Sequence, residues 1–283
     1  MSLYSSLSAK KEILNLYQQK LDQLNLDYST QDIETSFGNT HLIVTGNPSN
    51  PPLLLVHGSN GCAPIALEVY PNLSQKYQVF AIDVLAQPNK SAETRLSMKD
   101  NSYGEWVHEV FHKLQLKEVT LVGFSLGGLV ILKTLLHQEK NIKEVFLTAP
   151  AFIVNGNPLK AIFKIFIPMK RYMRTQKMQH LEQFVKALFS EKDPFALEFL
   201  SKVLIHFEMD FSSVPIIKTK EAQQIKTPIT LIAAGKDLIF PGQKMLKRAK
   251  KIFPSLKHTH LLKNSLHVQT TLDNRVVEQL ILA

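Results

Sequence analysis

The sequence predicts an α/β fold in which a mainly parallel sheet is flanked by helices and carries a helical insertion. Continuous apolar runs such as residues 53–56 alternate with segments of helical length, which is typical of buried parallel strands with helical crossovers. The alternation stops near residue 150 and resumes near residue 223. The residues between are rich in Phe and Met and contain no run typical of a buried strand, so they are expected to form helices.

The expected elements follow in order along the chain. Apolar residues at helical spacing predict an amphipathic helix at 8–25, and two short strands are expected between 31 and 45 around a hairpin-like turn. The next elements are strand 53–56, helix 66–75, strand 77–82, helix 102–114, strand 118–122, helix 126–136 and strand 144–148. Strand 228–233, helix 242–253, strand 258–262 and helix 268–282 complete the chain. The predicted division is a core of residues 1–150 and 223–283, with a helical cap inserted at 151–222.

Composition excludes several classes of protein. The chain has 283 residues, of which 45% are hydrophobic and 20% charged, so a mostly disordered chain is excluded. A single cysteine leaves no intramolecular disulfide and no Cys-rich zinc site. No apolar run approaches the ~18 residues of a transmembrane helix. The N-terminal residues lack the features of a secretory signal, so a cytoplasmic location is expected.

A glycine-rich motif marks a candidate nucleophile. Residues 123–128 read Gly-Phe-Ser-Leu-Gly-Gly and lie between a predicted buried strand and a predicted helix. This context fits the G-x-S-x-G motif, in which the serine occupies a tight turn and its neighbours two positions away must be small. Gly123 and Gly127 meet that requirement. The turn is expected to expose the Ser125 hydroxyl above the sheet and to direct the first amides of the helix toward it.

A carboxylate and a histidine follow in the chain order that this motif requires. A serine is a weak nucleophile and needs a base, which in turn needs an acid to orient it. Asp237 comes just past the predicted strand 228–233, and His267 follows the next strand. Both are expected at the carboxyl edge of the sheet, on the same side as Ser125. The pattern therefore predicts a Ser–His–Asp triad.

These motifs resemble those of the α/β-hydrolase superfamily over nearly all of the chain from about residue 31. The resemblance rests on His57-Gly58 after the first buried strand, the 123–127 motif, Gly235-x-Asp237 and His267. Among the subgroups, the chain looks most like capped bacterial serine hydrolases of the carboxylesterase type. The resemblance implies that Ser125 is the nucleophile, His267 the base and Asp237 its orienting acid.

The resemblance also implies an oxyanion hole formed by two backbone amides. Leu126 and Ser59 would supply these amides, and Asn60 is an alternative donor through its amide or its side chain. One departure from the usual pattern is Leu266, which stands where a glycine commonly precedes the catalytic histidine. The approach of the histidine loop is therefore open.

The expected activity is hydrolysis of a carboxylic ester of a small or medium apolar substrate through an acyl-enzyme. Phe124, Phe152, Phe163 and Phe166 are the expected substrate-binding residues, and no metal or other cofactor is implied. Hydrolysis of a carbon–carbon bond or a thioester and acyl transfer use the same triad and stay open. A non-catalytic ligand receptor on this fold is the alternative from another class.

Two further patterns are weighed against simpler interpretations. Residues 108–112 read His-Glu-Val-Phe-His, the string of helical zinc sites, but the predicted helix would bury Trp106 and Val110 and turn both histidines toward solvent. No third ligand is marked, so no metal site is predicted. The net charge is +9, and basic residues gather in two helical segments, at 244–251 and 164–177.

Neither basic segment has the features of a nucleic-acid-binding module, so no nucleic acid is expected. The 244–251 segment is predicted to be a solvated helix face. The 164–177 segment lies among Phe and Met residues, which indicates a weak membrane or lipid-surface contact through the cap as an alternative. The oligomeric state stays open.

Overall fold

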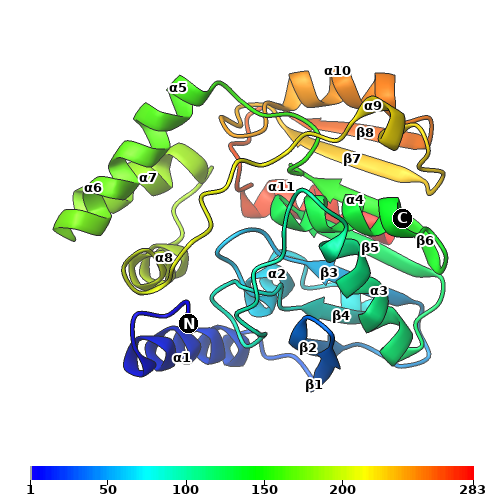
Figure 1. Cartoon of the computed structure of the whole chain (residues 1–283), viewed down its shortest axis with the longest axis horizontal. Helices are drawn as coiled ribbons and strands as arrows, with labels where there is room; N and C mark the ends of the chain where they lie inside the picture. The colour runs from blue at the N-terminus through cyan, green and yellow to red at the C-terminus, as the bar shows by residue number, and fades with distance from the viewer. Residues whose placement is uncertain (1) are drawn as a thin grey trace.

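Eight strands form one sheet in the order β1-β2-β4-β3-β5-β6-β7-β8 (Figure 1). The computed structural model describes residues 2–283. The strands are β1 (Tyr28–Thr35), β2 (Gly38–Thr45), β3 (Pro52–Val56), β4 (Gln78–Ile82), β5 (Val119–Phe124), β6 (Ile142–Thr148), β7 (Ile229–Ala234) and β8 (Leu256–Leu262). β3 to β8 pair in parallel, whereas β1 pairs antiparallel with β2 and β2 antiparallel with β4. The predicted mainly parallel α/β fold is confirmed.

Helices cover both faces of this sheet and extend beyond it. They are α1 (Leu7–Gln23), α2 (Ala63–Val69), η1 (Leu73–Gln75), α3 (Ser102–Leu114), α4 (Leu126–His137), α5 (Pro158–Ala161), η2 (Ile162–Phe166), α6 (Ile167–Thr175), α7 (Met178–Leu188), α8 (Pro194–His206), α9 (Thr219–Ala222), α10 (Gly242–Ile252) and α11 (Thr271–Leu282). Among the described residues, no helix is long and apolar enough to span a bilayer.

The alternation of side chains along each strand divides the core into two layers. One layer joins α3, α4 and α10 to residues such as Leu54, Leu121 and Leu231. The other joins α1, α2 and α11 to the neighbouring strand residues, such as Leu55 and Val122. This period of two is what places successive strand residues on opposite faces of a sheet.

Between β6 and β7 the chain leaves the sheet and forms α5, η2, α6, α7 and α8, which lie beside it (Figure 1). α5, η2 and α6 follow one another without a break, and η2 is a turn of π-helix in which the Ile167 amide donates to the Ile162 carbonyl. Pro168, whose nitrogen carries no hydrogen, follows directly. Residues 207–218, called the linker below, then return as extended chain to the core.

Two helix boundaries differ from the sequence-based expectation. The helix expected at 66–75 is two pieces, α2 and η1, separated by Pro71. The helix expected from residue 268 begins at Thr271, because the Thr270 side chain caps it by accepting from the Asp273 amide. Val268 instead pairs with Phe189 of the cap in a short parallel bridge. That difference shapes the loop of His267.

Candidate active site

Ser125 occupies a strained turn between β5 and α4. Its φ of 53° and ψ of −113° lie in a region that residues with a Cβ rarely adopt. The turn is tight because β5 passes directly into the helix. A Cβ at position 127 would lie 2.3 Å from the Val56 carbonyl oxygen, and one at position 123 would lie 2.8 Å from the Gly127 backbone. The glycines of the motif are thus required sterically, and the turn raises the Ser125 hydroxyl above the sheet edge.

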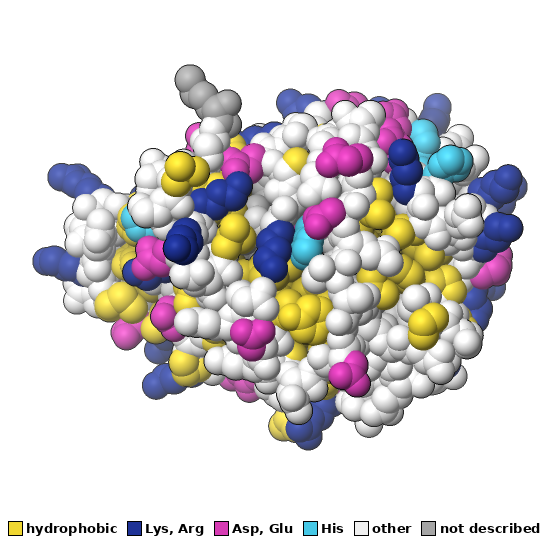
Figure 2. Space-filling view, turned by 90° about the horizontal axis from the view of Figure 1, so that it is seen from below, with side chains coloured by type: hydrophobic (Ala, Val, Ile, Leu, Met, Phe, Trp, Pro, Cys, Tyr) yellow, Lys and Arg dark blue, Asp and Glu magenta, His cyan; other side chains and the backbone are white. Residues whose placement is uncertain are grey.

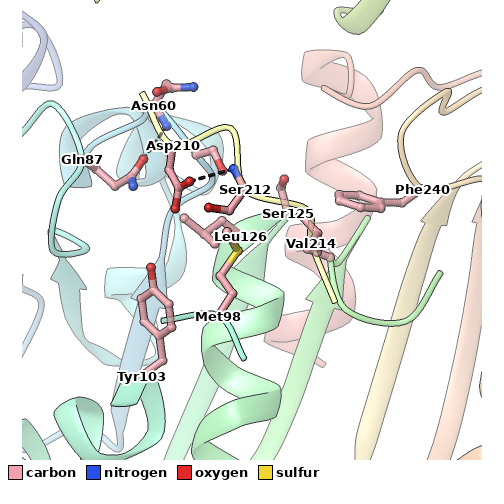
Figure 3. Close-up of a pocket in the computed structure, with 12 residues that line it drawn as sticks. Asn60, Gln87, Met98, Tyr103, Ser125, Leu126, Asp210, Ser212, Val214 and Phe240 are labelled. Atoms are coloured by element: carbon pink, nitrogen blue, oxygen red, sulfur yellow. Dashed lines mark hydrogen bonds between the residues drawn. The ribbon is translucent and has the colours of Figure 1, made fainter. Parts of the chain in front are cut away.

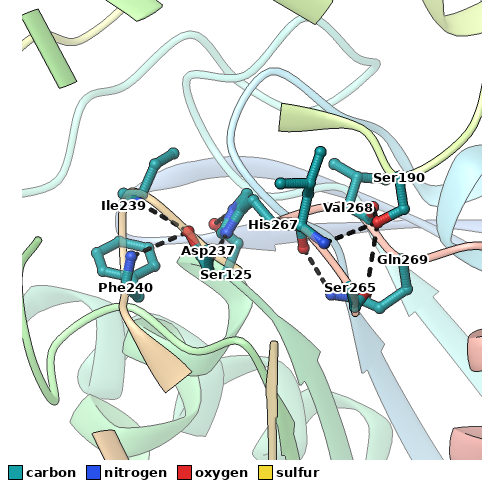
Figure 4. A network of polar contacts seen from close by, with 10 residues as sticks. Ser125, Ser190, Asp237, Ile239, Phe240, Ser265, His267, Val268 and Gln269 are labelled. Atoms are coloured by element: carbon teal, nitrogen blue, oxygen red, sulfur yellow. Dashed lines mark hydrogen bonds and ion pairs between the residues drawn. The ribbon is translucent and has the colours of Figure 1, made fainter. Parts of the chain in front are cut away.

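His267 connects Ser125 to Asp237. Ser125 follows β5, Asp237 follows β7 and His267 follows β8, so the three side chains meet at one edge of the sheet. His267 Nε2 lies 2.9 Å from Ser125 Oγ, and His267 Nδ1 lies 2.7 Å from Asp237 Oδ2 (Figure 4). Because a carboxylate only accepts, Nδ1–H donates to Asp237 and Nε2 is left to accept from the serine hydroxyl. This is the tautomer that a general base for Ser125 requires.

The carboxylate of Asp237 is held ionised. Burial by itself would raise its pKa, but the charge and hydrogen bond of His267 and two backbone amides outweigh burial and lower the pKa below the ordinary value. These amides belong to Ile239 and Phe240, and they donate to Asp237 Oδ1 over 2.7 and 3.1 Å (Figure 4). The other oxygen, Oδ2, therefore faces His267. Asp237, which orients the imidazole, is thus itself held in place by two backbone amides.

The loop that carries His267 is fastened to the cap. Leu266 donates its amide to Ser190 Oγ over 2.8 Å, and Ser190 Oγ donates to the Val268 carbonyl over 2.7 Å. Ser190 lies between α7 and α8, so a cap hydroxyl bridges the residues on either side of the histidine (Figure 4). On the core side, the Gln269 side chain donates to the His267 carbonyl. The loop is thus fixed without the glycine that commonly precedes this histidine.

Two aromatic rings enclose the imidazole. The ring centroid of Phe124 lies 5.0 Å from that of His267, and the ring of Phe240 meets it edge-on at 5.6 Å. Phe124 thus packs against the base. Phe152 is buried, and its ring lies 4.9 Å from the Lys133 ammonium.

The backbone amides of Leu126 and Ser59 are suited to bind an oxyanion. Leu126 is the first residue of α4, so its N–H is one of those that have no acceptor within the helix. Both residues line the cavity beside Ser125. Asn60 differs, because its amide donates to Gln87 Oε1 over 2.8 Å. The alternative role of the Asn60 amide is therefore not supported, since that donor is already engaged.

A small cavity of about 80 Å³ opens beside the Ser125 hydroxyl (Figure 3). Its volume is below the ~300–1,000 Å³ of sites for drug-sized ligands. Its lining comes from the core and from the linker rather than from the cap helices. The lining residues are Ser59, Asn60, Gln87, Met98, Tyr103, Ser125, Leu126, Ala151, Asp210, Ser212, Val214 and Phe240.

The expected substrate-binding phenylalanines do not line this cavity. Phe163 and Phe166 are 67% and 43% exposed on the cap, while Phe124 and Phe152 pack elsewhere, as described above. Sequence reasoning missed Asp210, Ser212 and Val214 because the linker has no periodic pattern. Among the lining residues that were missed, only Phe240 could have been found from the sequence, because it lies three residues after the candidate acid Asp237.

Comparison with known proteins agrees with the fold. The model of a protein family described as "alpha/beta hydrolase fold" matches residues 51–184, which include the Ser125 turn. The chain has the α/β-hydrolase fold. It is 26% identical over 257 residues to the uncharacterized carboxylesterase nap of Bacillus subtilis. This alignment covers 83% of the chain and 79% of the relative. It is 23% identical over 296 residues to carboxylesterase YbfK of the same organism, with 99% and 95% covered.

Solved structures show the same fold. The crystal structure of naproxen esterase (carboxylesterase NP) from Bacillus subtilis superimposes with a TM-score of 0.85 at 20% identity, covering 98% of both chains. That of CesB (YbfK) gives a TM-score of 0.84, also at 20% identity and 98% of both chains.

In this α/β-hydrolase-fold protein, His57 organises a loop and does not face the nucleophile. Its Nδ1–H donates to the Gly58 carbonyl over 2.7 Å, and Nε2 accepts from the Val84 amide over 3.0 Å. Burial lowers the pKa of this histidine, which favours the neutral ring that both bonds require. His57 therefore holds the segment that presents Ser59.

The H-E-x-x-H string lies on α3, away from the cavity. His108 Nε2 lies 2.7 Å from the Gln138 carbonyl oxygen, Glu109 accepts from the Ser36 amide, and His112 is exposed. No group of three or more His, Cys, Asp or Glu residues positioned for a metal occurs among residues 2–283.

Proposed function

We propose that the protein is a serine hydrolase that cleaves the carboxylic ester of a small or medium apolar substrate through an acyl-enzyme. The observation that carries the proposal is the chain of hydrogen bonds from Asp237 through His267 to Ser125, which ends at a cavity. The carboxylesterase names of the two relatives support an ester as the bond that is cleaved. Ser125 is the proposed nucleophile, His267 the base and Asp237 its orienting acid.

The proposed reaction has two halves. Ser125 Oγ attacks the ester carbonyl carbon while its proton passes to His267 Nε2. The carbonyl oxygen becomes an oxyanion that accepts hydrogen bonds from the Leu126 and Ser59 amides. His267 then gives the proton to the alkoxy oxygen, the bond from carbon to that oxygen breaks, and the alcohol leaves. In the second half, His267 takes a proton from water, whose oxygen attacks the acyl carbon. His267 then returns the proton to Ser125 Oγ as the bond from carbon to Oγ breaks, which releases the acid and restores Ser125.

The cavity supports a compact group next to the scissile bond. Ala151, Val214 and Phe240 form an apolar part of its wall, and Tyr103 and Gln87 supply polar groups. About 80 Å³ accommodates a short acyl or alcohol group, so we expect acetyl and butyryl esters to be preferred to long-chain esters.

Residues 151–222 are proposed to act as a cap domain on a core of residues 1–150 and 223–283. The proposed partner is a small-molecule ester rather than a nucleic acid. A cytoplasmic location is proposed as well, and the single cysteine agrees with it because no intramolecular disulfide is possible. The weak lipid contact of the cap belongs to the same set of proposals.

The proposal is tested by fluorophosphonate labelling and by hydrolysis of short p-nitrophenyl esters. We expect one adduct, on Ser125, and ester hydrolysis that Ser125→Ala abolishes. Asp237→Asn should lower kcat by about 10³–10⁴-fold, because the histidine then loses the acceptor that selects its tautomer. Thermal unfolding of both variants controls for the fold.

The same assay distinguishes the alternatives. If Ser125 is not labelled and the esters stay intact, the serine hydrolase proposal fails and a ligand receptor is favoured. If Ser125 is labelled but thioesters or vinylogous diketones are cleaved in preference to esters, the nucleophile is retained and the ester assignment is wrong.

A further inference from the structure

The cap carries an exposed apolar stripe. Leu159, Ile162, Phe163 and Phe166 are 64, 42, 67 and 43% exposed and lie on the continuous helix formed by α5, η2 and α6. Their spacing of three, four and seven residues places them on one face of the helix. Isolated exposed apolar residues are ordinary, but four on one helix face form a patch that water solvates poorly.

The protein does not bury this stripe because the helix packs through another face. Ile165, Met169 and Tyr172 are buried in the layer that also holds α7 and α8. The stripe is therefore an additional apolar face, beyond the one that fastens the helix to the cap. Nothing in residues 2–283 covers it.

The charge around the stripe is of one sign. Residues 145–181 contain six basic residues and no Asp or Glu. All six are exposed, and none forms an ion pair with another described residue: Lys160, Lys164, Lys170, Arg171, Arg174 and Lys177. The face in Figure 2 carries both signs. The other long stretch without Asp or Glu, residues 238–272, includes the basic helix α10, but that helix exposes no large apolar side chain.

We infer that this helix docks the protein on an anionic lipid surface. The exposed apolar side chains would enter the boundary between headgroups and acyl chains, and the lysines would extend their ammonium groups to the lipid phosphates. The helix lies at the end of the molecule, on the side away from the sheet (Figure 1). Such a projecting ridge fits a deformable bilayer, whereas a protein partner would need a matching groove.

The docking face is connected to the cavity. Lys170 of α6 lies 4.3 Å from the ring of Phe211, which is itself 49% exposed. Phe211 stands in the linker between Asp210 and Ser212, two residues that line the cavity. A protein held at a lipid surface through this helix would therefore keep its cavity close to that surface.

The inference concerns a surface and does not depend on ester hydrolysis, so it is tested by binding alone. The full chain is mixed with vesicles of phosphatidylcholine or of an equimolar mixture of phosphatidylcholine and phosphatidylglycerol, and the bound fraction is measured by flotation. We expect binding to the mixed vesicles only, weakening as salt is added because the charges are screened.

Two variants separate the contributions of charge and apolar surface. Lys160→Gln with Lys164→Gln should weaken binding roughly fivefold for each lysine, and Leu159→Ser with Phe163→Ser roughly tenfold or more. The matched control is Lys247→Gln with Lys250→Gln and Leu272→Ser, which alters exposed residues of α10 and α11 and should bind like the native chain. Thermal unfolding midpoints show that each variant is folded.

Three outcomes would overturn the inference. The first is no binding to either kind of vesicle, and the second is binding that the control variant loses as strongly as the cap variants do. The third is a dimer in gel filtration that Leu159→Ser with Phe163→Ser abolishes, since the stripe would then be covered by a second copy of the chain.

Discussion

One hydroxyl from a distant part of the chain helps to orient the candidate base. Ser190 Oγ accepts from the Leu266 amide and donates to the Val268 carbonyl, so it holds the residues on both sides of His267. Ser190 does not line the cavity and is a positioning residue.

Ser190→Ala should therefore lower kcat for a p-nitrophenyl ester by up to about tenfold, with little change in KM. The reason is that the part-buried Leu266 amide loses its acceptor, so the imidazole of His267 is less well held. Ser190→Thr keeps the hydroxyl and should restore most of the rate. Steady-state kinetics measure both effects. Ser201→Ala, which removes another cap hydroxyl bonded only within α8, is the matched control. An unchanged kcat in Ser190→Ala would show that the core side fixes the loop alone.

The residues of the catalytic chain were predictable from sequence, and the lining of the cavity was not. Ser125 sits in a motif that steric demands make recognisable, Asp237 follows a strand with a continuous apolar run, and His267 follows in the chain order that the motif requires. Asp210 and Val214 lie in a linker whose path depends on tertiary contacts, such as that from Asn155 Nδ2 to the Val214 carbonyl. Such contacts leave no periodic trace in a sequence.

At the scale of elements, α1 is fastened to the core by a carboxylate. Glu93 accepts from the Leu3 amide, from Ser2 Oγ and from Lys10 Nζ, the last over 2.7 Å. Burial by itself would raise the pKa of Glu93, but these three partners outweigh it and lower the pKa below its ordinary value of 4.5. A carboxyl group whose pKa is lowered by folding stabilises the folded state at pH values above its ordinary pKa. This stabilisation is lost as the pH falls through the lowered pKa.

Glu93→Gln should thus lower the free energy of unfolding by about 1–3 kcal/mol at neutral pH, because charge-assisted hydrogen bonds become neutral ones. The difference between the two proteins should shrink as the pH falls below 4.5. Urea unfolding at neutral and acid pH measures it. Glu182→Gln, at an exposed position, is the control and should differ little from the native protein at either pH. A difference for Glu93→Gln that is independent of pH would show that its charge plays no part.

The strands and the long helices of the core were predicted to within a few residues, whereas the helices within 151–222 and the irregular elements were not. The central strands, such as β3 and β7, carry the continuous apolar runs typical of a buried sheet, whereas the edge strand β8 reads Leu-Lys-His-Thr-His-Leu-Leu. The π-turn at Ile162–Phe166 adds one residue to a helical turn without altering composition, and Pro168 alone does not specify it. The late start of α11 depends on the pairing of Val268 with Phe189, which is a contact between cap and core.

At the scale of the whole molecule, the cap shares its core with α1 and with one face of the sheet. Phe199 of α8 is buried in the same cluster as Ile13 and Tyr17 of α1 and Leu55 of β3. Tyr4 packs edge-on against Phe207 at a centroid distance of 5.0 Å, and the two also form a backbone bridge. Segments distant in sequence therefore lose their apolar contacts together, which favours cooperative unfolding of cap and core.

The single tryptophan makes this cooperativity measurable. Trp106 is buried in the layer on the opposite face of the sheet from the cap, so its fluorescence reports the core and not the cap. Phe199→Ala should lower the free energy of unfolding by about 3–5 kcal/mol, the cost of a large cavity. We expect the urea midpoints from Trp106 fluorescence and from far-ultraviolet circular dichroism to fall by the same amount. Leu159→Ala, at an exposed cap position, should move neither midpoint. The contradicting result would be an early partial transition in circular dichroism with an unchanged fluorescence midpoint. The cap would then unfold as a separate unit, and its contacts with α1 would not couple it to the sheet.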